Sequence, residues 1–171
     1  MNTRQIANIF ILIIVLAPLT IYAQKSIRNQ QIVVDSLNNR VKQLTEANQR
    51  LIDNKKMVAD FYQQLFGDKD AEAIDKYIGE TYIQHNPILP DGRDTLKKTI
   101  KLWFKGVAKE KINIQHLSAD GDLVYIHTKS KFGNKTMSVI DIFRIENGKI
   151  VEHWDIIQEV PEKSANPHPM F

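Results

Sequence analysis

The sequence predicts an α+β domain, and three observations lead to this prediction. Apolar residues recur at helical spacing between residues 57 and 107, the chain beyond them consists of β-rich runs, and turn pairs separate those runs. Helices followed by an antiparallel meander are typical of the α+β class. The 43% hydrophobic and 25% charged fractions are those of a folded globular chain.

Three short helices are expected in the first part of this domain. Apolar residues at helical spacing predict a helix over 57–65, which Gly67 ends. A short second helix is predicted over 71–78, and a third, after the turn at 90–92, closes near Gly106. Between the second and third, residues 81–87 are predicted to be extended, because Pro87 keeps Asn86 out of the helical region.

Strands are expected in the rest of the domain. β-Rich runs cover residues 112–114, 123–127, 137–145 and 150–157. The turn pairs between them are Asp120-Gly121, Gly133-Asn134 and Asn147-Gly148.

A longer helix with heptad spacing is expected before the domain, over residues 24–53. β-Branched residues occupy three a positions, and Asn48 falls on the next one. Leucines occupy three d positions, but Gln30 interrupts the pattern at the first d position. This composition favours two parallel strands of a coiled coil. A helix that packs along its own domain or stays frayed is the alternative. The residues that define the pattern are Ile27, Val34 and Val41 at a, and Leu37, Leu44 and Leu51 at d.

Residues 1–23 have the layout of an export signal. Arg4 precedes an apolar run over 6–16, Pro18 follows, and Ala23 offers a cleavage point. The apolar run is shorter than the roughly 20 residues that a membrane span needs. The sequence therefore predicts a periplasmic or extracellular protein. The alternative is an uncleaved N-terminal anchor, which would be the only expected membrane contact.

The charge distribution argues against a nucleic-acid partner. The net charge is +3, but Arg4 is the only charge in the first 23 residues, so 22 of the 23 basic and all 20 acidic residues lie in the remainder. Such a near-balanced surface attracts phosphate backbones weakly. The chain has no cysteine, which excludes thiolate chemistry and Cys-bound metals. The sequence also contains no Gly-rich phosphate loop and no metal-spaced His/Glu pair, so neither a cofactor nor a metal is expected.

Three stretches carry a resemblance to a known family. MSVIDIFRIENGKIVEHWDIIQEVPE, YIQHNP and SANPHPMF resemble the SnoaL-like branch of the NTF2-like superfamily, in particular predicted bacterial aldol-condensation and polyketide-cyclase-type proteins. The resemblance covers residues 54–171. It implies a cone in which three helices pack on a strongly curved antiparallel sheet around a deep pocket, commonly in a dimer. It also implies that Asp155 occupies the acid/base position of the polyketide cyclases.

The register of the last hairpin decides which polar residues act together. A two-residue Asn147-Gly148 turn would place Asp141 opposite Trp154, with Asp155 on the other face. A three-residue loop ending at Gly148 would instead place Asp141 opposite His153. The second register is preferred because it gathers the polar groups inside an otherwise apolar face. The opposite face, a stripe for a homodimer partner, would carry Ile140, Ile142, Trp154 and Ile156.

These residues predict acid–base chemistry in an apolar pocket. Burial favours the neutral form of a carboxylic acid, so Asp155 is expected to hold or accept a proton near neutral pH. The catalytic candidates are Asp155, Asp141, His85 and His153. The ligand-binding candidates are Tyr82, Asn86, Trp103, His127 and Phe143.

Three functions remain open at this point. The first is a cofactor-independent lyase, isomerase or cyclase acting on a small apolar or carbonyl-containing molecule. The second is a non-catalytic small-ligand binder, since the fold hosts both. The third is an envelope interaction module built on the heptad helix. Structural roles are the alternative for individual residues, such as a simple pair between Asp141 and His153.

Overall fold

The computed structural model describes the backbone of residues 3–171 and the side chains of residues 18–171. The chain divides into two compact units, residues 1–47 and residues 48–171. Each is treated separately below. The predicted signal or anchor at residues 1–23 falls largely outside the described side chains. Among the residues that the structure describes, no helix is long and apolar enough to cross a membrane.

From Thr3 onward, the first unit is helical and belongs to α1 (Thr3–Tyr62). The helix continues through Pro18. Proline removes a single backbone N–H donor, and the neighbouring hydrogen bonds of a long helix can continue on either side of that gap. From Ile27 to Leu44, the large apolar side chains of this unit are exposed.

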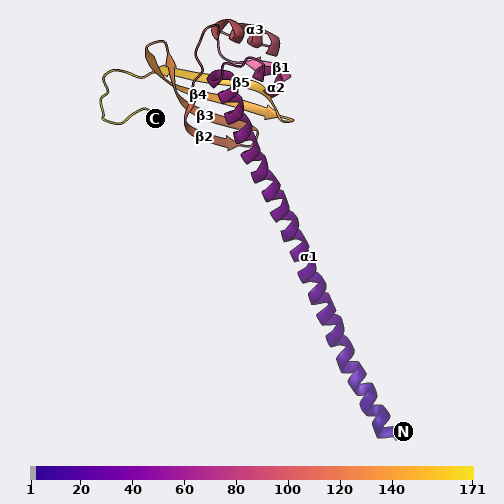
Figure 1. The fold of residues 1–171 in the computed structure, drawn as a ribbon. Helices are drawn as coiled ribbons and strands as arrows, with labels where there is room; N and C mark the ends of the chain where they lie inside the picture. The colour runs from indigo at the N-terminus through magenta and orange to yellow at the C-terminus, as the bar shows by residue number, and fades with distance from the viewer. Residues whose placement is uncertain (1–2) are drawn as a thin grey trace. The chain divides into compact units, whose positions relative to one another are not determined.

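The second unit contains three further helical segments and five strands (Figure 1). The helical segments are η1 (Gln63–Gly67), α2 (Ala73–Tyr77) and α3 (Arg93–Trp103). The strands are β1 (Ile78–Gln84), β2 (Asn113–Asp120), β3 (Leu123–Phe132), β4 (Lys135–Glu146) and β5 (Lys149–Glu159). The α+β class is confirmed.

All five strands form one sheet in the order β1-β5-β4-β3-β2. The β2–β5 meander is antiparallel, as predicted, but β1 pairs with β5 in parallel. The prediction of an antiparallel sheet was therefore wrong at this edge. The reason is that the extended segment before Pro87 begins as early as Ile78 and joins the sheet beside the C-terminal strand.

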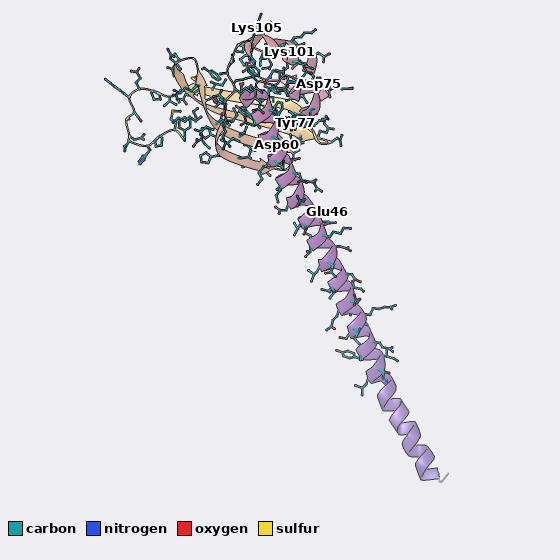
Figure 2. The ribbon with its side chains drawn as sticks, viewed as in Figure 1. Glu46, Asp60, Asp75, Tyr77, Lys101 and Lys105 are labelled. Carbon is teal, nitrogen blue, oxygen red and sulfur yellow. The ribbon has the colours of Figure 1, made fainter. Side chains whose placement is uncertain are left out.

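The core lies on one face of the sheet. Phe61 and Leu65 from the first helical segments, Ile74 from α2 and Ile100 from α3 pack with buried residues of the strands. Phe61 contacts Phe143 edge-on, with ring centroids 5.8 Å apart. Ion pairs also hold α3 against α2. Lys97 Nζ of α3 lies 2.5 Å from a carboxylate oxygen of Asp75 in α2 and 2.6 Å from one of Glu72, which precedes α2. Asp75 and Lys101, which also belongs to α3, are labelled in Figure 2.

α1 is followed by a π-helical turn, η1. The sequence did not predict this turn. It is fixed by Gln63, whose side chain donates to the Glu110 carbonyl (3.1 Å) and accepts from the Ile112 N–H (3.0 Å). Gly67 leaves room for this side chain, because a Cβ there would lie 2.1 Å from Gln63 Nε2. Such turns are frequent at functional sites. Here it contacts the segment that enters β2, through the bonds of Gln63 to residues 110 and 112.

The β4–β5 hairpin follows neither register that the sequence offered. Asn147 and Gly148 have φ of 51° and 72° and form a two-residue turn of the primed kind. The register then shifts near Val151, so that Arg144 pairs with Glu152 and Asp141 with Asp155. The predicted pairing of Asp141 with His153 was therefore wrong.

The predicted face is nevertheless confirmed. The observed pairing differs from the preferred one by two residues, and side chains alternate with a period of two, so the same residues share a face. Asp141, His153 and Asp155 thus lie on one side of the sheet. Ile140 and Ile156, on the other side, are exposed.

Candidate functional site

A cavity of about 400 Å³ lies between the helices and the sheet of the second unit. Most of its lining is apolar, from α1, η1, α3 and the strands. Polar side chains gather on its sheet side, where β4, β5 and the end of β1 meet. They are Tyr82, Gln84, Asn86, Asp141, His153 and Asp155.

Asp141 is the centre of a buried hydrogen-bond network. Its side chain is 5% exposed, one oxygen contacts His153 Nε2 at 2.8 Å, and the other accepts the Tyr62 hydroxyl at 2.8 Å. Burial, followed by the adjacent Asp141, raises the pKa of Tyr62 well above its ordinary value. Tyr62 therefore stays protonated and donates to Asp141 at neutral pH.

Gln84 determines the protonation of His153. Its Oε1 accepts the Asn86 backbone N–H (2.9 Å), so this atom is an acceptor, and His153 Nδ1 lies 2.9 Å from it. His153 must therefore donate through Nδ1. The other ring nitrogen, Nε2, lies 2.8 Å from Asp141 Oδ1.

The same glutamine orients Tyr82. Because Oε1 is used as an acceptor, Gln84 Nε2 is the group that donates to the Tyr82 hydroxyl oxygen at 3.1 Å. The hydroxyl proton of Tyr82 is then left to point elsewhere, and Tyr82 lines the cavity. Burial, followed by the nearby Asp141, raises the pKa of Tyr82. Tyr82 is accordingly a neutral hydrogen-bond donor for a ligand.

Asp155 is positioned by Asn86. The Asn86 Oδ1 accepts the Ile88 N–H (2.9 Å), which identifies its Nδ2 as the donor that contacts Asp155 Oδ2 at 2.5 Å. Among the hydrogen bonds of the described residues, none involves Asp155 Oδ1. Since Asp155 lines the cavity, this oxygen is the carboxylate atom that a bound molecule can reach.

Seven of the nine candidate residues line this cavity: Asp155, Asp141, His153, Tyr82, Asn86, Trp103 and Phe143. His85 and His127 are not among the lining residues of the described chain. Gln84 points towards His153, so His85, the next residue, points away and stacks on Trp154 with ring centroids 4.6 Å apart. His127 lies between the buried Ile126 and Thr128 and therefore also faces outward, where it contacts His116 and Ser138.

The sequence analysis did not select Tyr62, Gln84 or Thr128. Tyr62 was assigned only to a helix face, yet it crosses the core to Asp141, with Thr128 Oγ1 3.4 Å from its hydroxyl. Gln84 lies inside the YIQHNP motif and was read only as part of an extended segment. Its neighbouring histidine attracted the catalytic assignment, because histidine is the more common acid–base residue.

The same polar cluster contains the atom types of a metal site. Asp141, His153 and Asp155 offer ligand atoms within 4.8 Å of one another, a set that suits divalent transition metals. However, His153 Nε2 and Asp141 Oδ1 bond each other, and Tyr62 uses the second Asp141 oxygen. A metal ion bound by all three residues would have to displace these bonds.

Outside the cavity, Glu152 joins β1, β4 and β5 on the outer face. It accepts from His85 Nε2 (2.8 Å) and Arg144 Nε (2.6 Å), and these bonds, that of His85 first, lower the pKa of Glu152. A carboxylate with a lowered folded-state pKa contributes stability above its unfolded pKa of about 4.3 and loses it as the pH falls through the folded value.

We therefore expect Glu152→Gln to lower the free energy of unfolding at pH 7 by about 1 kcal/mol or less. The difference from the unmodified chain should shrink as the pH falls below about 4. Urea denaturation at several pH values measures it. Glu146→Gln is the matched control, because Glu146 contacts only the Arg144 guanidinium, at 3.3 Å, and is largely exposed. An equal effect for both variants would contradict the assignment to the His85–Glu152–Arg144 cluster.

A mixed five-stranded sheet with helices on one face and a cavity between them is the NTF2-like architecture. Residues 56–163 match the SnoaL-like polyketide cyclase family, and the chain belongs to that family. The resemblance stated from the sequence is thereby confirmed. Comparison with curated proteins finds no match.

Solved structures share the fold at low sequence identity. TsrD from Streptomyces laurentii is 18% identical, with 62% of this chain and 88% of that chain covered and a TM-score of 0.51. An NTF2-like protein of unknown function from Burkholderia xenovorans LB400 is 14% identical, with 66% and 88% covered and a TM-score of 0.54. An LEH-like epoxide hydrolase from M. tuberculosis is 16% identical, with 64% and 85% covered and a TM-score of 0.52.

Proposed function

We propose that the domain is a cofactor-independent acid–base catalyst that acts on a small, mostly apolar carbonyl compound. One observation carries the proposal: Asp155 lines an apolar cavity with one carboxylate oxygen held by Asn86 and the other available to a ligand. A carboxylate fixed in this way is positioned to accept a proton from a carbon next to a carbonyl group.

The neighbouring groups supply the other half of the reaction. As Asp155 takes the proton, negative charge develops on the carbonyl oxygen, and a preorganised donor such as the Tyr82 hydroxyl stabilises it. Tyr82 is suited to this role because Gln84 already occupies its acceptor side. The His153–Asp141 pair lies on the same side of the cavity and offers a second acid–base group. Return of the proton to a carbon completes an isomerisation. In an aldol closure the enolate carbon instead bonds to a second carbonyl carbon, and the proton goes to the alkoxide oxygen that this bond creates; the reverse reaction breaks the same bond.

Exchange of carbon-bound hydrogen for deuterium tests the proposal without knowledge of the product. Ketones, β-keto esters and small aromatic carbonyl compounds are incubated with the full chain in D₂O, and their α-protons are followed by NMR. Epoxides are included because one structural neighbour is an epoxide hydrolase. Accelerated exchange or turnover for a compound supports catalysis. Binding of several compounds with no acceleration of any would instead support the non-catalytic ligand-binding function.

We further propose that the domain acts outside the cytoplasm, because residues 1–23 combine a basic start, an apolar run and Ala23. Expression of the full chain in a bacterium, followed by cell fractionation and intact-mass measurement, tests this. A periplasmic or extracellular protein that begins at Gln24 is expected. Full-length protein in the membrane fraction would indicate an uncleaved anchor, and full-length protein in the cytosol would contradict export.

A further inference from the structure

The first unit carries an apolar stripe with the spacing of a coiled-coil seam, here called the heptad stripe. It consists of Ile27, Val34 and Val41 at a positions and Leu37 and Leu44 at d positions. Each of these side chains is 47–65% exposed. A stripe of this kind is stabilised when a partner helix inserts its own a and d residues between them. Two further exposed apolar side chains between Ile27 and Leu44 lie off the stripe: Ile32 at an f position and Val33 at a g position.

Charged residues are arranged to suit a partner of identical sequence. Between residues 24 and 53 the sequence has eight charged side chains, and seven of them lie at the outward b, c and f positions. Arg40, at g, is the exception. The e and g positions are otherwise uncharged, so two copies can approach along the stripe without like-charge repulsion. The seven outward residues are Lys25, Arg28, Asp35, Lys42, Glu46, Arg50 and Asp53.

Four of the seven outward charged residues, Asp35, Lys42, Glu46 and Asp53, have partners within the helix itself. Gln31 donates to Asp35 at 2.9 Å, and Lys42 lies 4.0 Å from Glu46, each four residues apart. Figure 2 shows Glu46 on this part of α1. Pairs at this spacing support the helix without a partner's help. The helix therefore has a self-sufficient polar face and an apolar face that is left to be covered.

We propose that a second copy of this chain covers the heptad stripe, in a parallel two-stranded coiled coil. β-Branched residues at a and leucine at d are the combination that favours two parallel helices over higher oligomers. The sequence continues the pattern with Asn48 at the next a position, and a buried Asn pairs with its equivalent only when the helices are parallel and in register. The coiled coil thus makes the chain a dimer through its first unit.

The absence of cysteine in the chain allows a direct test by disulfide cross-linking. Single variants Leu37→Cys and Leu44→Cys place a thiol at d, where equivalent residues of parallel helices face each other. Asn39→Cys and Glu46→Cys place it at f, on the outside. The full-length variants are treated with diamide, which oxidises two thiols to one disulfide and is itself reduced. Dimer formation is followed with time on non-reducing gels.

Both d variants should form the cross-linked dimer about tenfold or more faster than both f variants, because a disulfide requires Cα atoms within about 7 Å. Equal rates at d and f would overturn the proposal, as would no cross-linking at either d position. Cross-linking of one d variant alone would overturn the parallel register, since equivalent residues of antiparallel helices meet only at the centre. A dimer held by the folded domains alone gives no dependence on heptad position.

Discussion

Asp155→Asn should remove the acceleration of α-proton exchange, with a rate loss of about 10² to 10⁴ for any carbonyl compound that the unmodified chain activates. The amide keeps the size of the carboxylate, and its oxygen can still accept from Asn86 Nδ2, so the cavity should keep its shape. What it loses is the ability to take a proton at neutral pH. NMR exchange rates measured at equal protein concentration give the loss directly.

Ligand binding separates this expectation from a loss of fold. The same compounds should bind Asp155→Asn with affinities within a few-fold of the unmodified chain, because most of the cavity lining is apolar and unchanged. His127→Gln is the control, since His127 faces away from the cavity. Exchange that persists in Asp155→Asn would mean that another group is the base. Equal losses in both variants would point to a general effect on the fold.

The fold followed from the sequence where local signals agree with tertiary packing. Apolar periodicity and turn pairs located α3 and the β2–β5 meander, because the glycine of each pair, Gly121, Gly133 and Gly148, takes the positive φ that its tight turn needs. β1 was missed as a strand partner because a parallel pair between residues 78–84 and β5 leaves no signal near either segment. The π-turn was missed because it depends on Gln63 reaching residues 110–112.

The alternation of side chains along the strands allowed one part of the site to be predicted. Asp141, His153 and Asp155 were placed together, since any register of the right parity puts them on one face. His85 and His127, which are not among the residues lining the cavity, follow the opposite alternation to the residues that face it. The sequence does not reveal which alternation faces the cavity when the register of the sheet is unknown. Tyr62 and Gln84 act through contacts between elements far apart in the chain, so only the assembled structure identifies them.

Asp141→Ala should be the most destabilising substitution in the polar cluster, lowering the free energy of unfolding by about 3–5 kcal/mol. The change leaves the buried Tyr62 hydroxyl and His153 Nε2 without their shared acceptor. Tyr62→Phe removes one donor from the same carboxylate and should cost about 1–3 kcal/mol. Urea denaturation followed by tryptophan fluorescence reports on this unit, because both tryptophans, Trp103 and Trp154, lie within it.

Combining the two substitutions tests whether they act on one network. The cost of Asp141→Ala with Tyr62→Phe should be less than the sum of the single costs, because the phenyl ring no longer presents a buried donor that lacks an acceptor. Asp120→Ala, at the exposed end of β2, is the control and should change stability by no more than about 0.5 kcal/mol. Additive costs would show that Tyr62 and Asp141 contribute independently to stability. If Asp141→Ala costs no more than the control, the buried carboxylate serves the cavity and contributes nothing to the stability of the fold.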